Sequence, residues 1–414
     1  MLLKNTGNII IAPQSVTDNP TKCLRCKNDK KDLFYTYTSE YYNGTVTYCM
    51  NCVQLGAMTD RTPLIGVEVV SSKERAQFIL DFELSEIQKN ASQALLKASI
   101  KNRNVLLSAV TGAGKTEITF ESISAARQAG KRVAFIAPRI DVVKEIYLRL
   151  STAFMNSRID LKYDGVKLEF EHQFLVATVQ QLFNYHHHFD LIIVDETDAF
   201  PLTTDDTLMQ AIKSAATTDH SIIFMTATPS KRMLKFLGQY ETVTINKRYH
   251  GHPLAIPQLE WQDVINQMRK KKTNKRLVDL LRKIVAEKRK VLVFVPEIEL
   301  MHQLEALLMH HFDSMTSVYS DDVLRYDKVD AIRESKIEIL LTTTILERGV
   351  TFSYLDVIVI GADHYDFSSL MQICGRVGRK IDDPIGHIYF FTEFQTLDLI
   401  RTVKTIHQLN GAES

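Results

Sequence analysis

A glycine-rich segment at residues 109–116, AVTGAGKT, constrains the fold of this chain more than any other feature. The mainly apolar residues 104–108 precede it and predict a buried strand, while residues 117–127 have a pattern typical of a helix. A strand, a glycine-rich loop and a helix in this order form a phosphate-binding loop, in which backbone N–H groups face an anion. We therefore expect Lys115 to contact the β- and γ-phosphates and the Thr116 hydroxyl to bind Mg²⁺. The full set of residues expected to bind the nucleotide phosphates is Thr111, Gly112, Ala113, Gly114, Lys115 and Thr116.

An acidic motif follows a second apolar run at residues 190–194. This run predicts a strand that ends at Asp195 and Glu196, and open α/β sheets bind ligands at such strand ends. We expect Asp195 to hold Mg²⁺ and Glu196 to orient or deprotonate the attacking water, because phosphoryl transfer depends mostly on positioning and charge neutralisation. An acidic loop facing solvent is the alternative interpretation of this motif when it is taken alone.

A third motif, at residues 372–379, places Arg376 and Arg379 three positions apart. At helical or turn spacing both guanidinium groups can face one cleft, where they would stabilise charge developing on a γ-phosphoryl group. A structural salt-bridge cluster is the alternative interpretation. Taken together, the three motifs indicate an ATP-driven motor that acts on nucleic acid.

With these motifs the chain resembles the superfamily 2 helicase-type ATPases, which have two RecA-like domains. The resemblance implies that Gln88 reads adenine and that Glu347 contributes to the nucleotide site. It also implies strand-contact and coupling roles for further residues, with Arg348 near both strand and nucleotide. These residues are Arg139, Thr178, Gln180, Thr226, Thr228, Thr343 and Arg348.

Four cysteines precede the motor as two C-x-x-C pairs, Cys23 with Cys26 and Cys49 with Cys52. This spacing allows four thiolates to close a tetrahedral zinc site, and the β-prone residues between the pairs predict a hairpin that turns at Asn43-Gly44. Disulfides are the competing interpretation, although the chain shows no secretory signal. We expect the fifth cysteine, Cys374, to be a packing residue.

The cysteine pairs ahead of a compact motor resemble the ComFA family of competence ATPases. Two departures, Thr197 and Cys374, lie at positions that carry no chemistry. The resemblance implies a cytoplasmic ATPase, stimulated by single-stranded DNA, that helps to draw transforming DNA through a membrane channel. It further implies two partners, single-stranded DNA and other competence proteins at the channel on the inner face of the membrane. Association with other copies of the chain is left open by the sequence. A general DNA or RNA helicase and a non-catalytic zinc-dependent adaptor remain as alternatives.

The alternation of strand and helix patterns predicts an α/β fold of two RecA-like domains with parallel sheets, preceded by a small zinc-ribbon-like domain. We expect a flexible arm at 1–20, the ribbon at 21–60, the first motor domain at 75–248 and the second at 258–414. No apolar run approaches the roughly 18 residues that a membrane span requires.

Charge and aromatic residues leave two questions open. The net charge of the 414 residues is +1, so any contact with nucleic acid must be local. The basic run at 269–276 could contact phosphates or be a solvated helix face. The tyrosines of the predicted hairpin could stack on bases, but we expect most of them to cover the ribbon. His186, His187 and His188 have no acidic or cysteine partner nearby in sequence and predict a polar loop.

Overall fold

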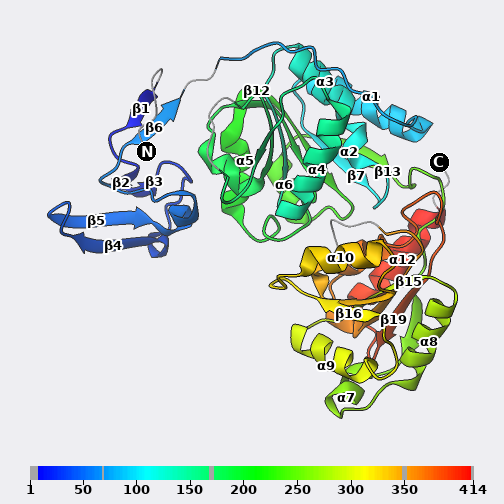
Figure 1. Cartoon of the computed structure of the whole chain (residues 1–414). Helices are drawn as coiled ribbons and strands as arrows, with labels where there is room; N and C mark the ends of the chain where they lie inside the picture. Colours follow the sequence, from blue (N-terminus) through cyan, green and yellow to red (C-terminus); the bar gives the residue numbers. More distant parts are fainter. Residues whose placement is uncertain (1–7, 68–69, 167–171, 347–351, 412–414) are drawn as a thin grey trace. The chain divides into compact units, whose positions relative to one another are not determined.

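The computed structural model describes residues 8–67, 70–166, 172–346 and 352–411 (Figure 1). The chain divides into two compact units, each made of two segments. The first unit is Met1–Leu107 with Thr116–Val243, and the second is Ser108–Lys115 with Thr244–Ser414. The phosphate-binding loop therefore groups with the second unit, although the strand before it belongs to the first large sheet.

The first large sheet has seven strands in the order β13-β7-β12-β11-β8-β10-β9. Its central strands are continuous apolar runs, because both faces of a parallel sheet are covered by helices. The pairs β9/β10, β10/β8, β8/β11 and β11/β12 are parallel. The strand bounds are β7 (Val105–Ala109), β8 (Val133–Ala137), β9 (Asp160–Lys162), β10 (Phe174–Thr178), β11 (Phe189–Val194), β12 (Ala216–Thr226) and β13 (Glu241–Ile245).

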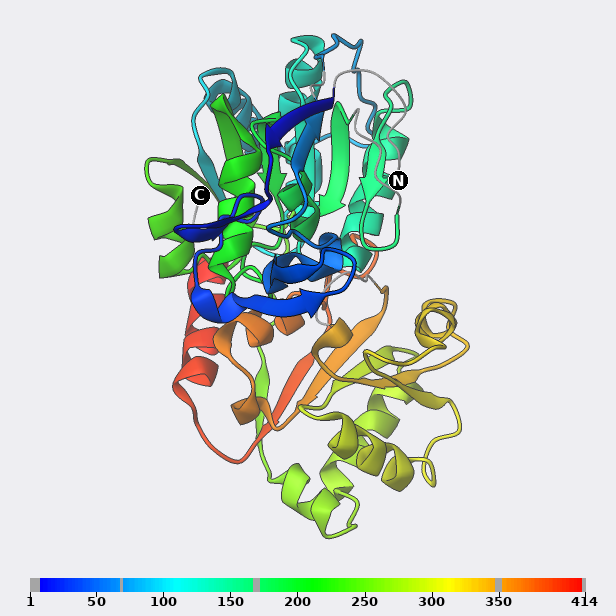
Figure 2. The ribbon, with the colours of Figure 1, turned by 90° about the vertical axis from the view of Figure 1, so that its left-hand side faces the viewer.

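Helices flank this sheet on both faces: α5 lies on one side, and α3 and α4 lie on the other (Figures 1 and 2). Phe120 and Phe154, from α3 and the end of α4, pack edge to face with ring centroids 5.4 Å apart. The helix bounds are α1 (Glu86–Ile100), α2 (Lys115–Ile118), α3 (Phe120–Gln128), α4 (Ile140–Ala153), α5 (Asp206–Ala215) and α6 (Lys231–Leu237), with the 3₁₀ helix η3 at Val179–Asn184.

The second large sheet has six strands in the order β14-β19-β18-β15-β17-β16, and all of its pairs are parallel. The strand bounds are β14 (Gln258–Trp261), β15 (Lys290–Phe294), β16 (Met315–Val318), β17 (Ile339–Thr342), β18 (Leu355–Ile360) and β19 (Ile388–Thr392). The helix bounds are α7 (Val264–Arg269), α8 (Lys275–Ala286), α9 (Ile298–Leu308), α10 (Arg325–Arg333), α11 (Phe367–Cys374) and α12 (Leu397–Gly411), with 3₁₀ helices η4 (Thr344–Leu346) and η5 (Ala362–His364).

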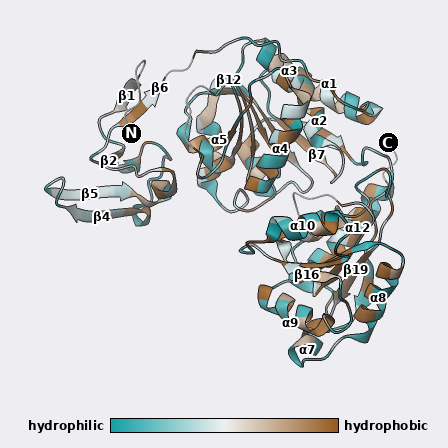
Figure 3. Cartoon of the chain, in the orientation of Figure 1, coloured by the Kyte–Doolittle hydropathy of each residue, from teal (hydrophilic) through white to brown (hydrophobic). Residues whose placement is uncertain are grey.

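Each large sheet is the apolar centre of its domain. Figure 3 shows hydrophobic residues concentrated on the strands and hydrophilic residues on the outer sides of the helices. In the second domain, helices α7, α8 and α9 contribute buried aliphatic side chains to one cluster with β15, β17 and β18. Two parallel sheets covered by helices confirm the predicted α/β class with two RecA-like domains.

The N-terminal module consists of short antiparallel pairs. β1 (Asn8–Ala12) pairs with β6 (Leu64–Val67), β2 (Val16–Asp18) pairs with β3 (Thr21–Cys23), and β4 (Phe34–Ser39) pairs with β5 (Gly44–Cys49). Two 3₁₀ helices complete it, η1 (Lys31–Leu33) and η2 (Met50–Leu55).

Two details of this module differ from the sequence analysis. Residues 8–12 and 16–18, which were expected in a flexible arm, form strands because partners later in the sequence pair with them. The predicted hairpin is present, but Ser39 pairs with Gly44, so the turn is a four-residue loop rather than a type I′ turn at Asn43-Gly44. Asn43 has a positive φ of 46°, whereas Gly44 continues the strand.

The module packs against the first motor domain through its cysteines. Cys23, Cys26, Cys49 and Cys52 belong to the same apolar cluster as Leu182 and Phe183 of η3. The hairpin tyrosines are more accessible: Tyr35 is 54% exposed and Tyr41 is 88% exposed. The module therefore presents an aromatic surface while its cysteines are buried.

Candidate nucleotide, strand-contact and metal sites

The phosphate-binding loop begins where the buried strand β7 ends. Gly112 and Gly114 have φ of 81° and 73°, a region that residues with a Cβ rarely adopt. Helix α2 starts at Lys115, whose Nζ donates to the carbonyl of Ala109 at the head of the loop, over 3.5 Å. Thr111 and Thr116 are buried. The local backbone is thus the one that a loop wrapped around phosphates requires.

Several candidate residues of the first domain follow parallel strands of one sheet. Because β8, β10, β11 and β12 run in the same direction, the segments after them lie at the same edge of the sheet. Arg139 follows β8, Thr178 and Gln180 lie at and after the end of β10, Asp195 and Glu196 follow β11, and Thr226 and Thr228 lie at and after the end of β12. The fold therefore gathers motifs that are far apart in the sequence.

The acidic motif has an unusual backbone. Glu196 has φ of 49°, in the left-handed region, and such conformations of residues other than glycine cluster at functional sites. The Asp195 N–H donates to the Ile136 carbonyl, and the Glu196 N–H donates to Oδ1 of Asp195, both over 2.8 Å. The first bond ties the backbone of the acidic motif to β8, and the second orients the Asp195 carboxylate.

An arginine of α4 that the sequence analysis missed, with 43% of its side chain exposed, lies near this motif. Burial alone would lower the pKa of Arg149, but the carboxylates of Glu145, Glu117 and Asp195 raise it. Arg149 contacts Glu117, which follows the phosphate-binding loop, over 3.2 Å. The sequence around Arg149 on α4 contains no recognisable motif, so its proximity to the acidic motif is visible only in the structure.

The acidic motif is bonded directly to the threonine motif after β12. The Thr228 hydroxyl donates to Oδ2 of Asp198 over 2.6 Å, and the Thr228 N–H donates to the Thr226 hydroxyl over 2.9 Å. The Thr197 hydroxyl donates to the Met225 carbonyl over 3.2 Å. A shift of one motif must therefore move or break bonds to the other.

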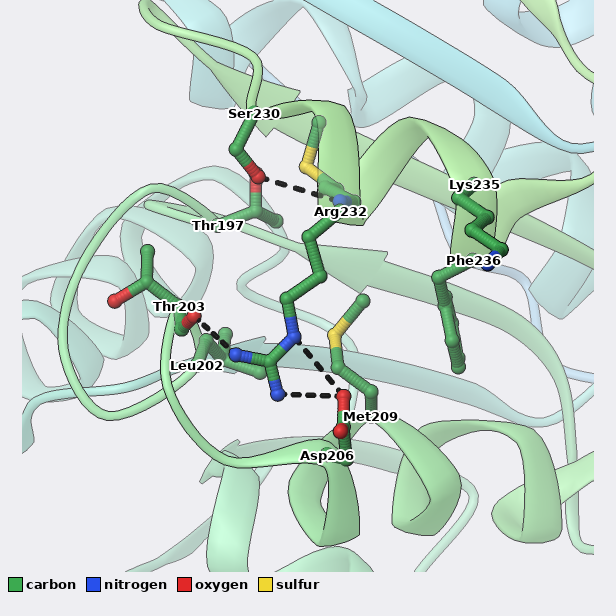
Figure 4. Close-up of a pocket in the computed structure, with 10 residues that line it drawn as sticks. Thr197, Leu202, Thr203, Asp206, Met209, Ser230, Arg232, Lys235 and Phe236 are labelled. Carbon is green, nitrogen blue, oxygen red and sulfur yellow. Dashed lines mark hydrogen bonds and ion pairs between the residues drawn. The ribbon is translucent and has the colours of Figure 1, made fainter.

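A cavity of about 400 Å³ lies beside this junction (Figure 4). Arg232 of α6 crosses it and donates to the Thr203 carbonyl and to the Asp206 carboxylate. The Ser230 hydroxyl caps α6 by accepting from the Met233 N–H. Arg232 thereby ties the segment after the acidic motif to the helix after the threonine motif.

Gln88 has a structural partner. It is 3% exposed, and its side-chain oxygen accepts from the Ser85 N–H over 2.9 Å, which completes a capping box at the start of α1. The side chain expected to read adenine thus also caps a helix.

In the second domain, Thr343 follows β17, whereas Glu347 and Arg348 lie outside the described residues. The arginine motif follows α11. Arg376 is 2% exposed, and the more accessible Arg379 donates from Nε to the Gly375 carbonyl over 2.7 Å. Cys374 is buried as expected, and burial raises the pKa of its thiol.

The four cysteines form one buried cluster, with all four sulfur atoms within 4.8 Å of one another. The Sγ atoms of Cys23 and Cys52 are 3.7 Å apart, and those of Cys26 and Cys49 are 3.5 Å apart. These distances are far from the roughly 2.05 Å of a disulfide. They are close to the ~3.8 Å edge of a tetrahedron with Zn–S bonds of about 2.3 Å. The donor set and its spacing fit zinc.

The histidine triplet contributes no second cluster. His188 is buried, its Nε2 lies 2.9 Å from the His172 carbonyl, and burial lowers its pKa to about 4. Across the described residues, the cysteines form the one group with metal-ligand geometry. None of the described helices has the length and apolarity to cross a membrane.

Three family models match the chain. Residues 3–66 match the competence protein ComFA N-terminal domain, residues 81–231 the type III restriction enzyme res subunit, and residues 272–380 the helicase conserved C-terminal domain. The order of these matches follows the order of the module and the two motor domains.

Curated relatives match over nearly the whole chain. The competence protein ComFA of Bacillus subtilis is 32% identical over 97% of this chain and 88% of its own length. The competence protein ComFA of Streptococcus pneumoniae is 34% identical over 94% of this chain and 90% of its own length. Among solved structures, Saccharomyces cerevisiae Dbp5 bound to RNA and ADP BeF3 has a TM-score of 0.56 at 15% identity, covering 79% of this chain and 92% of that chain. This last likeness concerns the fold.

Proposed function

This chain belongs to the ComFA family of competence proteins, and we propose that it uses ATP hydrolysis to move along single-stranded DNA during the uptake of transforming DNA. The coarser activity, that of a helicase-like ATPase, follows from its two helicase domains and its relatives. The observation that carries the proposal is the gathering of acidic, threonine and strand-contact motifs at one edge of the first sheet.

We assign the chemistry of hydrolysis to four residues that follow β7 and β11. Lys115 neutralises the β- and γ-phosphates, while Thr116 and Asp195 hold Mg²⁺, which supplies further charge neutralisation when bound. Glu196 orients the attacking water and accepts its proton. Its left-handed backbone is of a kind that clusters at active sites, which supports this role. Arg379, with Arg376, stabilises charge on the transferred phosphoryl group.

Coupling to DNA runs through the bond between Thr228 and Asp198. A shift in the position of Glu196 on hydrolysis moves the rest of the acidic motif and, through this bond, the threonine motif. Both motifs lie at the same edge of the sheet as Arg139 and Gln180. These strand-contact residues bind the DNA backbone. Each round of ATP hydrolysis thereby changes the contacts that these residues make with the DNA strand.

Zinc has a structural role in this proposal. Four buried thiolates would complete its coordination and leave no open position for a substrate. The Asn28 side chain lies 3.9 Å from the sulfur of Cys49 and supports it as an outer partner. The module around it, with its exposed tyrosines, is available to DNA or to another competence protein.

The proposal is tested by measuring ATP hydrolysis by the purified protein alone and with single-stranded DNA, duplex DNA or RNA. We expect strong stimulation by single-stranded DNA and little by the others. Equal or greater stimulation by RNA or duplex would instead indicate a general helicase. Absence of hydrolysis under every condition would indicate an adaptor.

The basic run provides a local test of DNA binding. Its lysines Lys270–Lys272 are exposed in the loop between α7 and α8. Ile265 of α7 packs beside Gly361, where an added Cβ would come within 2.5 Å of it, and Gly361 follows β18. The loop therefore lies near the carboxyl edge of the second sheet, the edge that also carries Thr343.

We expect the triple replacement of Lys270, Lys271 and Lys272 by Glu to weaken binding of single-stranded DNA. If all three contact phosphates, the slope of log affinity against log salt falls by about two, at ~0.7 per contact. Fluorescence anisotropy over a salt series measures both quantities. The control carries Lys283→Glu, Lys288→Glu and Lys336→Glu, the same charge change at exposed positions away from that edge. If both triple variants lost the same affinity for single-stranded DNA, the effect would come from the change in net charge and not from contacts made by Lys270–Lys272.

A further inference from the structure

Arg248 is a buried cation in basic surroundings. It follows β13 in the second unit and is 3% exposed. Burial lowers its pKa to about 10, and the nearby charge of Arg379 acts in the same direction. Cys374 is also close, but burial raises the pKa of this thiol, so it stays neutral and supplies no counter-charge. Among the described residues, no carboxylate forms an ion pair with Arg248.

One edge of the Arg248 guanidinium has no partner. Nη1 donates to the Gly378 carbonyl over 2.7 Å, whereas Nε and Nη2 are buried without a hydrogen-bond acceptor in the described part of the chain. Nε and Nη2 lie on the same side of the planar group, and together they form the fork that pairs with two oxygens of a phosphate. A buried charge with two unmet donors is costly, so this edge is built for an anion.

The phosphate-binding loop lies directly beside this side chain, within the same unit. A Cβ added at Gly112 would lie 3.7, 3.8 and 3.9 Å from Cγ, Cδ and Nε of Arg248. The Val110 N–H donates to the Ile245 carbonyl, and the Tyr249 N–H donates to the Gly112 carbonyl, both over 3.1 Å. Residues 245–249 are therefore bonded to the loop on both sides of Arg248.

The arginine motif holds the other side of Arg248. A Cβ at Gly378 would come within 2.8 Å of Nη1, so glycine is required for this approach. His250 also contacts the Gly378 carbonyl, with Nε2 3.0 Å from it. Arg248 is thus fixed between a glycine of the phosphate-binding loop and the segment that contains Arg379.

We propose that Arg248 binds the terminal phosphate of ATP through Nε and Nη2, as a nucleotide contact supplied by the link between the two sheets. The inference rests on the proposed function, because it requires the loop at Gly112 to bind ATP. The terminal phosphate is favoured over the inner ones because Arg379, to which we assign the γ-phosphoryl group, is the charged neighbour of Arg248.

The test compares Arg248→Met and Arg248→Lys with the wild type, using calorimetric titration with Mg–AMP-PNP and Mg–ADP. We expect the Met variant to bind AMP-PNP about 10- to 100-fold more weakly, as expected for loss of charge-assisted hydrogen bonds, with much less change for ADP. The Lys variant keeps the charge but lacks the fork, so we expect an intermediate loss. The control Arg333→Met removes an exposed arginine of α10 in the same unit.

Thermal unfolding without nucleotide separates binding from structure. Because the Met variant removes a buried charge with unmet donors, its melting temperature should equal or exceed that of the wild type. A lower melting temperature with equal losses for AMP-PNP and ADP would assign Arg248 a structural role and overturn the inference. Unchanged AMP-PNP affinity would also overturn it, while leaving the proposed function intact. A wild type that binds neither nucleotide would refute the proposed function itself.

Discussion

Replacing Lys115 by Ala is expected to abolish ATP hydrolysis, with turnover reduced at least ~100-fold, because the positive charge that we assign to the transferred phosphate is lost. The Lys115 ammonium makes one long hydrogen bond, 3.5 Å to the Ala109 carbonyl, within the described residues. The fold therefore depends little on this side chain. Steady-state phosphate release with saturating single-stranded DNA measures the effect.

Lys131→Ala is the matched control for this experiment. Lys131 lies in the first domain, where its Nζ donates to the Asn102 side chain over 2.8 Å at the surface. We expect this variant to hydrolyse ATP at the wild-type rate, and both variants to melt near the wild-type temperature. Wild-type hydrolysis by the Lys115 variant would remove the residue from the nucleotide site.

Replacing Cys23 and Cys26 together by Ser is expected to release one equivalent of zinc and to unfold the N-terminal module. A structural zinc site contributes roughly 10–16 kcal/mol to the folding of a small domain. The short strand pairs of this module bury too little apolar surface to replace such a contribution. Elemental analysis measures the metal, and limited proteolysis within residues 8–67 measures the unfolding.

Cys374→Ala serves as the control for cysteine chemistry, because Cys374 is buried in the second domain and lies outside the cluster. We expect it to retain the metal. Metal-free wild-type protein, prepared without chelators, would contradict the zinc assignment, and so would a double serine variant with its full metal content.

The large sheets and their motifs could be predicted because their signals are local. Residues 190–194 form an apolar run that ends at the acidic pair Asp195 and Glu196, so the periodicity and the motif indicate the same strand. The alternation with helices then fixes the parallel sheet and its carboxyl edge. The cysteine spacing likewise predicts a cluster without knowledge of the rest of the fold.

The remaining features depend on contacts that sequence spacing does not encode. β1 exists because β6 pairs with it, and the three-residue strand β9 is an edge strand with a weak pattern of its own. The left-handed conformation of Glu196 and the position of Arg149 follow from packing around β11. Arg248 stands at the end of the predicted first motor domain and belongs to none of the predicted motifs, and its surroundings come from residues 108–115 and 374–379.

The apolar cluster that joins the cysteine module to the first domain has a consequence for regulation. Leu182 and Phe183, which pack in this cluster, belong to η3, and η3 starts directly after Thr178. A segment to which we assign DNA contacts therefore packs against a module whose folding we expect to depend on zinc. Zinc supply in the cell would then act as a permissive signal. A chain made under zinc starvation would still hydrolyse ATP, but η3 would lack the packing that holds the DNA-contact residues in place.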